Sequence, residues 1–317
     1  MPVPAQNQQY ENFIIRYKQN THGGFDYESD ETFQIVNDLF GILYVPMQEV
    51  PELELSSYSY SSIPRCYTYM DTGALSTSGV TRLHNHPYLK LQGKGTLVAV
   101  IDSGIDYLHP AFHNGVQSKI FSIWDQTLEG GADGRIPFGR EFGRQQIEQA
   151  LASENPWEIV PSSDTNGHGT RSAATAAGYR IEKDNFCGAA PEAEIVIVKL
   201  KQAKNYLRDF YLLPRDIDIF QEDDIMLAIS YVLFIAQEQQ MPLSICIGLG
   251  TSMGAHQGEG PLNEYINSIA AFTQNAVSVP AGNEGTARHH YLREFGPNDT
   301  EDTVELRVGD RESAEDL

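Results

Sequence analysis

The sequence is poor in cysteine and has no long apolar run, and both shortages exclude classes of protein. Its three cysteines, Cys66, Cys187 and Cys246, stand far apart and without metal-ligand spacing. Such a set predicts neither a disulfide scaffold nor a zinc site and favours a reducing compartment, with each cysteine as a small buried side chain. No apolar run reaches the roughly 18 residues of a transmembrane helix, so we expect no membrane partner.

Basic residues are also scarce, with 22 Lys and Arg against 43 Asp and Glu and a net charge of −21. An acidic surface repels phosphate backbones and anionic lipid, so we expect neither nucleic acid nor membrane surfaces as partners. Residues 1–20 lack the basic and apolar stretches of a secretory signal, which predicts a location in the cytoplasm. With 317 residues, 41% of them apolar, the chain predicts one large folded domain or two smaller ones.

Residues 1–73 have the pattern of a small α+β domain. Apolar stretches predict strands at 11–17 and 41–47, and a short helical pattern covers 30–40 between them. The segment 71–79 is made mostly of small and polar residues and predicts an exposed linker. We therefore expect a domain boundary after residue 73.

Residues 74–317 alternate between short apolar runs and helical patterns. The apolar runs predict strands at 97–101, 194–200, 243–248 and 276–280. The helical patterns lie at 171–178, 223–238 and 261–275. Continuous apolar strands that alternate with helices predict an α/β domain, a parallel sheet with helices on both faces. The segment 120–167, rich in Gly, Pro and charge, predicts a long insertion that interrupts the alternation.

Three polar residues follow predicted strands or open a predicted helix, where active sites of parallel sheets lie. Asp102 ends a buried strand in VIDSGID. His168 lies between two glycines at a helix start in NGHGT, where the helix N-terminus disfavours the imidazolium and favours a neutral base. Asn283 follows a strand in PAGNEG, where its amide can donate to a developing oxyanion. Asp102 and Asn283 are, each alone, also compatible with an ordinary turn, whereas the glycines and the helix start around His168 favour a functional role.

Taken together and in this order, the three motifs resemble those of the subtilisin-like serine proteases, the subtilases. GAAPEAEIVIVK at 188–199 and GLG at 248–250 fit the same pattern, so the resemblance covers about 74–285. It implies a three-layer α/β fold, hydrolysis of peptide bonds through an acyl-enzyme, a peptide or protein substrate, and no cofactor. It further implies that residues 1–73 are a propeptide, a folding aid and intramolecular inhibitor, cleaved near 70–73.

The resemblance also implies a role for each matching residue. Asp102 orients and supports the histidine, His168 is the general base and then the general acid, and Asn283 contributes to the oxyanion hole. Two backbone segments grip the extended substrate by β-augmentation. They consist of Gly248, Leu249 and Gly250, and of Pro280, Ala281 and Gly282.

The sequence departs from the family at the nucleophile. The family's serine is expected downstream of Asn283 in a Gly-Thr-Ser context. Ser313 is the serine found after Asn283 in the printed sequence, and it has neither a preceding strand nor a neighbouring glycine. Ser252 has such a context in GTSMG, but it precedes Asn283 and no helix is predicted after it, so we do not favour it. We therefore expect this chain by itself to be inactive. The alternative is a non-catalytic regulator, a pseudoprotease that binds a partner through the same groove.

The insertion before His168 and the lack of a secretory signal resemble the spore-germination subtilases and related intracellular members. That narrower resemblance predicts a cytoplasmic or spore-associated protein. Two other patterns are not favoured. Asp71 and Asp102 lie too close in sequence for the two lobes of an aspartic protease, and His84 with His86 offers too few ligands for a metal.

Overall fold

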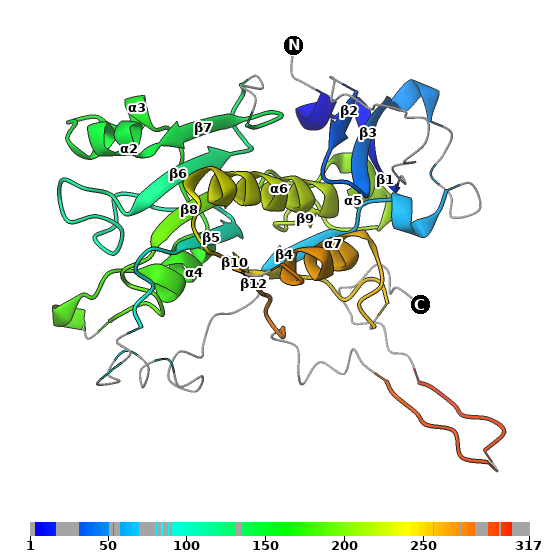
Figure 1. The fold of residues 1–317 in the computed structure, drawn as a ribbon. Coiled ribbons are helices and arrows are strands. Elements are labelled where there is room, and N and C mark those ends of the chain that lie inside the picture. The colour runs from blue at the N-terminus through cyan, green and yellow to red at the C-terminus, as the bar shows by residue number, and fades with distance from the viewer. Residues whose placement is uncertain are drawn as a thin grey trace, which may run out of the picture.

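The computed structural model describes residues 4–16, 32–50, 53, 58–69, 80, 84, 88, 91–130, 135–184, 186–255, 257–272, 274–282, 291–297 and 299–305. Its centre is a six-stranded sheet in the order β12-β10-β5-β8-β6-β7 (Figure 1). The strands are β5 Leu97–Asp102, β6 Ile120–Asp125, β7 Arg140–Gly143, β8 Glu194–Lys199, β10 Leu243–Ile247 and β12 Asn275–Ser278. Neighbouring strands are parallel except for β6 and β7, so the predicted α/β fold is confirmed.

β5 lies at the middle of this sheet and is buried along its whole length. Its residues pair with β10 on one side and with β8 on the other. The chain runs from β5 through β6 to β8 on one side and then crosses to β10 on the other. In sheets of this kind, ligands bind beyond the carboxyl ends of the strands where this reversal occurs. We therefore expect a ligand site at the carboxyl ends of β5 and β10.

The prediction of an insertion over 120–167 is wrong for its first part, because β6 and β7 belong to the central sheet. Two polar residues, Ser122 and Asp125, interrupt the apolar run of β6. Both are satisfied inside the protein, since Ser122 Oγ lies 2.8 Å from the hydroxyl of Tyr231 and Asp125 Oδ2 accepts from Ser162 Oγ at 2.7 Å. Buried polar residues with partners of this kind therefore concealed a core strand.

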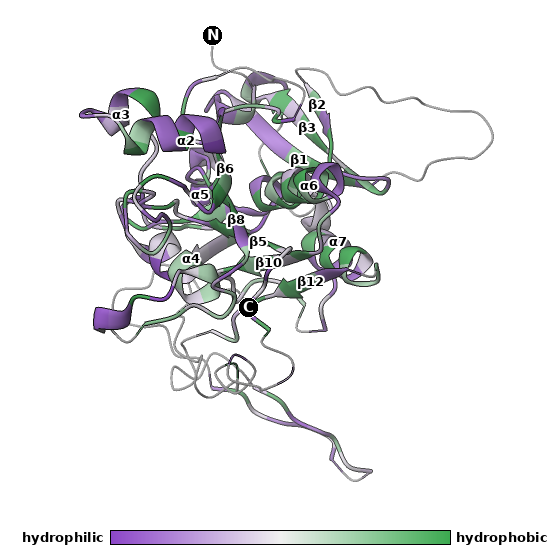
Figure 2. Cartoon of the chain, turned by 60° about the vertical axis from the view of Figure 1, so that its left-hand side comes forward, coloured by the Kyte–Doolittle hydropathy of each residue, from purple (hydrophilic) through white to green (hydrophobic). Residues whose placement is uncertain are grey.

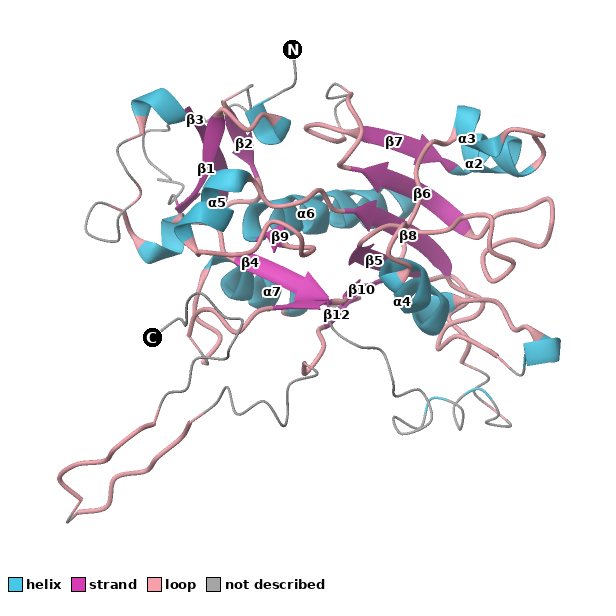
Figure 3. Cartoon of the chain, turned by 180° about the vertical axis from the view of Figure 1, so that it is seen from behind, coloured by secondary structure: helices cyan, strands magenta, loops and turns pink. Residues whose placement is uncertain are grey.

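Helices cover both faces of the sheet (Figure 3). α4 His168–Ala177 packs on one face, and α6 Glu222–Gln239 and α7 Pro261–Ala270 pack on the other. The predicted helix over 261–275 ends five residues early, and β12 begins at Asn275. At the far edge lie α2 Arg144–Leu151, largely hydrophilic in Figure 2, and α3 Pro156–Ile159. In the part of the chain that the structure describes, no helix is long and apolar enough to cross a bilayer.

An antiparallel sheet of β1 Tyr10–Arg16, β3 Phe40–Pro46 and β2 Phe33–Ile35 packs on α6, so that α6 is buried between two sheets. The helix expected over 30–40 is wrong for its described residues. β2 and a turn occupy them instead, because Asn37 Oδ1 accepts hydrogen bonds from the backbone of Leu39 and Phe40, both at 2.8 Å. Asparagine competes with a helix in this way.

A third, small sheet places β4 Cys66–Tyr69 between β11 Leu249–Gly250 and β9 Phe220–Gln221. Both pairings are antiparallel. β4 comes from the N-terminal part of the chain, and its two neighbours come from the part that builds the central sheet. The remaining helical elements are α5 Asn205–Phe210, and the 3₁₀ turns Pro4–Gln6, Met47–Glu49, Tyr60–Ser62 and Glu182–Asp184.

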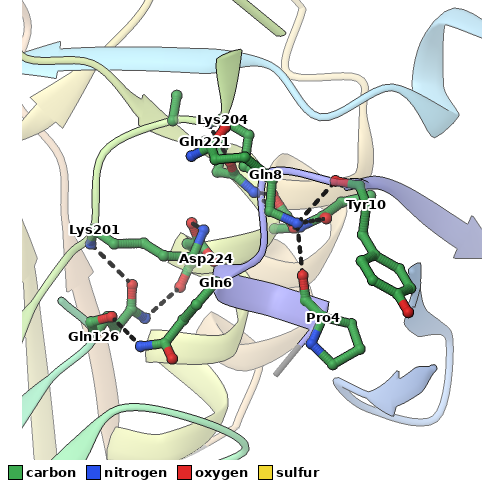
Figure 4. Close-up of polar contacts among 12 residues, drawn as sticks. Pro4, Gln6, Gln8, Tyr10, Gln126, Lys201, Lys204, Gln221 and Asp224 are labelled. Atoms are coloured by element: carbon green, nitrogen blue, oxygen red, sulfur yellow. Dashed lines mark hydrogen bonds and ion pairs between the residues drawn. The ribbon is translucent and has the colours of Figure 1, made fainter. Parts of the chain in front are cut away.

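The extreme N-terminal segment docks through a buried polar cluster (Figure 4). The Nζ atom of Lys204 donates to the carbonyl oxygens of Pro4 at 2.8 Å and Tyr10 at 3.1 Å, and to Asn12 Oδ1 at 2.6 Å. Asn12 in turn donates from Nδ2 to Asp223 Oδ2 at 2.5 Å. We call Lys204, Asn12 and Asp223 with their partners the N-terminal cluster. It ties residues 4–12 to the start of α6.

Burial controls the charges in and beside this cluster. Burial, together with the charge of the nearby Lys201, lowers the pKa of Lys204 to about 7. Asp224, fully buried and 2.5 Å from the Nζ atom of Lys201, has a pKa raised by burial to about 7. Both shifts follow from the removal of charged groups from water.

Candidate active site

Asp102 ends β5 with its side chain completely buried. The backbone N–H of Ser103 donates to Asp102 Oδ1 at 2.7 Å and fixes the carboxylate at the turn. Gly104 continues this turn at φ 124°, a conformation that side chains rarely adopt, and a Cβ there would lie 2.9 Å from the carbonyl oxygen of Ser163. The sequence Asp-Ser-Gly therefore holds a carboxylate, out of water, at the end of a central strand.

His168 opens α4, directly above that carboxylate. Its Nδ1 atom lies 2.7 Å from Asp102 Oδ1, and the histidine is 7% exposed. Gly167 precedes it at φ 80°, and a Cβ on Gly169 would lie 2.2 Å from the carbonyl oxygen of Gly104. The glycines thus let the helix start approach the β5 turn. Because a carboxylate only accepts, Nδ1 carries the proton and donates to it, which makes Nε2 the basic nitrogen.

Asp164 joins the two motifs, and the sequence interpretation missed it. Its carboxylate accepts hydrogen bonds from Ser103 Oγ at 2.8 Å, from Gly167 N at 2.9 Å, and from Thr170 N at 2.8 Å and Oγ1 at 2.6 Å. Burial by itself raises the pKa of Asp164, but the bonds from Thr170, Ser103 and Gly167 outweigh it and lower the pKa below the ordinary value. The signal was present in the sequence as an aspartate a few residues before a Gly-His-Gly helix start.

Gly248 follows β10 and closes the site from the neighbouring strand. A Cβ at this position would lie 2.3 Å from Asp102 Oδ2, 3.1 Å from His168 Cε1 and 3.3 Å from Ser172 Oγ. Asp102 Oδ2 and Ser172 Oγ are both buried and have no hydrogen-bond partner among the described residues. The carboxylate thus keeps accepting capacity on its Gly248 side.

The two residues after Gly248 form β11, the expected substrate-binding strand. In the structure β11 is already paired with the chain's own β4, Leu249 with Tyr69 and Gly250 with Thr68. The other edge of β4 pairs with β9. An extended segment of this chain therefore occupies the position expected for a bound peptide, next to the Asp102–His168 pair.

The remaining expected site residues are only partly described. Pro280, Ala281 and Gly282 follow β12, with Ala281 and Gly282 exposed. Asn283 lies outside the described residues, so its role in an oxyanion hole stays a prediction. Ser252 is exposed in a turn after β11, away from any helix start.

The histidines singled out as possible metal ligands and the three cysteines lie outside the candidate dyad. His84 Nε2 lies 2.7 Å from the carbonyl oxygen of Ala189, whereas His86 lies outside the described residues. The structure shows no group of three or more His, Cys, Asp and Glu that could hold a metal, as far as it describes the chain. All three cysteines are free thiols. Burial, together with the nearby charge of Asp102, raises the pKa of Cys246 to about 11.

An apolar hollow of about 650 Å³ lies on the α4 face of the sheet, between α4 and the strands β5, β10 and β12. Small and apolar side chains line it, among them Val98, Ala176, Cys246, Ala276 and Ser278. Side chains alternate along a strand, so Val98, Val100 and Asp102 share one face of β5, and Cys246 and Gly248 share that face of β10. The hollow therefore opens on the same sheet face as the candidate dyad.

Comparison with known proteins finds relatives of this chain. Residues 93–211 match the subtilase family. The chain is 29% identical over 196 residues to an intracellular serine protease of Paenibacillus polymyxa, a match that covers 61% of this chain and 43% of that protein. It is 27% identical over 127 residues to a subtilisin-like protease of Arabidopsis thaliana, covering 34% of this chain and 15% of that protein.

A solved structure also matches, that of the CspB protease of Clostridium perfringens. The TM-score is 0.54 with 29% sequence identity, over 66% of this chain and 39% of that chain. The resemblance to the subtilases and the subtilisin-like fold are thereby confirmed. The chain spans less than half the length of each of these three relatives.

Proposed function

We propose that this chain carries the aspartate and the histidine of a subtilase-type serine endopeptidase. The observation that supports this most is the 2.7 Å hydrogen bond between His168 Nδ1 and the buried carboxylate of Asp102. The two residues lie 66 positions apart in the sequence, and glycines at 104, 167 and 169 bring their backbones together. A buried carboxylate behind a histidine is the arrangement that keeps Nε2 available as a base.

In the proposed reaction, His168 Nε2 takes the proton of a serine hydroxyl while the serine oxygen attacks the peptide carbonyl carbon. Asp102 stabilises the imidazolium that forms. The imidazolium then protonates the leaving amine, and the acyl-enzyme is hydrolysed by water with His168 again as the base. The amide of Asn283 would donate to the oxyanion, a contribution worth about 3 kcal/mol in such sites.

The serine belongs, in this proposal, to a segment outside the printed sequence. The apolar hollow beside α4 supports this, because it opens on the face of the dyad and its small side chains leave space for a packed helix. The printed chain alone then hydrolyses no peptide.

The N-terminal part is proposed as an intramolecular inhibitor and folding aid, with cleavage within residues 70–73. Support comes from β4, which fills the middle position of the small sheet as a bound peptide would. A location inside the cell is proposed on the likeness to the Paenibacillus protein. Association with spores is proposed on the part of the predicted insertion that follows β7 and precedes His168.

The test is the intact mass and activity of the protein isolated from its own cells. We expect a species longer than 35.3 kDa, or two pieces cut within 70–73, with peptidase activity that His168→Ala abolishes. A single species of 35.3 kDa without activity would instead support the regulator. Turnover that survives His168→Ala would place the chemistry elsewhere.

A further inference from the structure

Arg65 immediately precedes β4, and its side chain is held in a buried pocket. Nε donates to Glu222 Oε2 at 3.2 Å and Nη2 donates to Glu222 Oε1 at 3.0 Å, while the backbone N–H of Arg65 donates to Oε2 at 3.1 Å. Arg65 is 4% exposed and Glu222 is fully buried. The planar fork of the guanidinium thus meets the carboxylate through two parallel bonds.

The pocket has room for the guanidinium because two of its residues are glycines, which have no side chain. A Cβ on Gly254 would lie 2.2 Å from Arg65 Nη1, and one on Gly260 would lie 2.0 Å from Nη2. Both glycines have positive φ, 91° and 131°, which favours glycine. The backbone N–H of Leu262 donates to Glu222 Oε1 at 3.2 Å and fixes the carboxylate. We call Glu222, Gly254, Gly260 and Leu262 the Arg65 pocket.

Every member of the Arg65 pocket comes from outside the N-terminal part of the chain. The pocket is therefore formed by the same part of the chain as β9 and β11, the two strands that pair with β4. Arg65 continues the pairing of β4 with β9, since the N–H of Glu222 donates to the carbonyl oxygen of Arg65 at 2.7 Å. Because Glu222 binds both the backbone and the side chain of Arg65, the residue that fills the pocket has a fixed position along the bound strand.

We propose that the Arg65 pocket is a specificity site that selects an arginine in the peptide substrate, three residues before the one that pairs with Gly250. In the chain's own strand, Thr68 pairs with Gly250 and Arg65 lies three residues earlier. This inference rests on the proposed function, because it takes β4 as the stand-in for a substrate.

The pocket should prefer arginine because displacement of β4 leaves the carboxylate of Glu222 without its partner. Glu222 is fixed by the backbone of α7 and lies out of water, so without a cation its charge is poorly compensated. A substrate arginine restores both parallel bonds. A lysine restores the charge through a single point contact, and a neutral residue restores neither. We therefore expect the order arginine, lysine, neutral.

The first experiment uses the full chain with Arg65→Ala, which empties the pocket. Methylguanidinium should raise the melting temperature of this variant, whereas methylammonium at the same concentration should raise it less. The matched control is Arg16→Ala, which removes a surface guanidinium 3.0 Å from Glu264, and methylguanidinium should not stabilise it. Equal effects of methylguanidinium on the two variants would overturn the proposal.

The second experiment uses NMR to titrate a peptide with the sequence of residues 63–70 into the Arg65→Ala chain, up to the millimolar concentrations needed to displace the chain's own β4. The same peptide with citrulline in place of arginine keeps the shape without the charge, and it should bind at least about tenfold more weakly. The ratio should vanish in the Arg65→Ala, Glu222→Gln double variant. Equal binding of the two peptides to the single variant would contradict the proposal.

Arg65→Gln keeps a polar side chain of similar reach and replaces Arg65→Ala in both experiments if the alanine variant does not fold. The first experiment measures stability and the second measures peptide binding, so neither depends on peptidase activity. A pocket that prefers arginine in a protein without peptidase activity would therefore refute the proposed function and leave the pocket as a peptide-binding site. A pocket without preference in an active peptidase would refute the pocket alone.

Discussion

At Gly248 the missing side chain keeps the candidate dyad intact. We predict that Gly248→Ala costs about 1–3 kcal/mol of stability, because the new Cβ, 2.3 Å from Asp102 Oδ2, forces the carboxylate or β10 to move. The strongly deshielded proton NMR signal of the His168–Asp102 hydrogen bond should shift or disappear. Gly143→Ala is the control, since a Cβ there meets nothing within 4 Å, and it should cost less than about 1 kcal/mol. A Gly248→Ala spectrum identical to that of the wild type would contradict the described geometry.

Asp164 acts on the site through the turn and helix start that it joins. Asp164→Asn should destabilise the protein by about 1–3 kcal/mol at neutral pH, since it removes the charge that four hydrogen bonds stabilise. The pKa of Asp164 is lowered in the folded protein, so this stability is present above the carboxyl's ordinary pKa and is lost as the pH falls through the lowered value.

Urea unfolding at several pH values checks this prediction. The difference between wild type and Asp164→Asn should be largest at neutral pH and should shrink in acid. Asp216→Asn, at an exposed position, serves as the control and should change stability little at any pH. A gap between wild type and Asp164→Asn that stays constant into acid would show that the carboxylate charge has no part in holding the turn.

Among the elements, the N-terminal segment depends on the charge state of Lys204. Its pKa of about 7 lies below the unfolded value near 10.4, so above pH 7 the unfolded chain binds a proton that the folded chain does not. The free energy of unfolding should therefore rise between about pH 7 and pH 9, by at most about 1.4 kcal/mol per pH unit from this group. In Lys204→Met that component is absent, and the carbonyl oxygens of Pro4 and Tyr10 lose their donor.

Unfolding of both proteins at pH 7, 8 and 9, within the window just derived, tests this. Subtracting the variant from the wild type removes the contribution of all other groups. The remaining difference should grow with pH. If it is flat, Lys204 keeps its proton in the folded protein throughout this range, and the nearby charges of Asp223, Asp224 and Glu11 outweigh the effect of burial on its pKa.

The elements that the sequence predicted best are those with one dominant physical signal. β5 and β8 are continuous apolar runs rich in β-branched residues, and α6 is a long apolar helix, so all three appear close to their predicted bounds. β6 was missed because buried polar side chains break its pattern, and their partners are distant in sequence. β9 and β11 have two residues each, too few for any period.

For the candidate site, sequence reasoning placed Asp102 and His168 on adjacent elements, because strand ends and helix starts meet at one edge of a parallel sheet. Asp164 and the Arg65 pocket were not predicted. Their meaning depends on contacts across long sequence separations, such as that between Arg65 and Glu222. A charged residue in a sequence does not reveal whether its partner is water or a buried carboxylate.

At the scale of the whole molecule, the attachments described above hold the N-terminal part to the rest: the packing of β1–β3 on α6, the central position of β4 and the N-terminal cluster around Lys204. We predict that a chain cut within residues 70–73 stays assembled, because none of these attachments needs the peptide bond. Size-exclusion chromatography should show the two pieces eluting together, and Arg65→Ala with Lys204→Met should make them separate at lower urea. Immediate separation of the wild-type pieces in buffer would contradict this prediction.

The covalent link that follows β4 adds a further consequence. While the chain is intact, β4 competes for its place between β9 and β11 at an effective concentration in the millimolar range, as joined modules do. A free peptide with the same contacts must match that concentration to displace it. Once the link is cut and the N-terminal piece dissociates, dilution removes the high effective concentration of β4. Binding of another peptide then depends on the affinity and concentration of that peptide alone. Cleavage of one peptide bond after β4 thus lowers the concentration of free peptide needed to bind between β9 and β11.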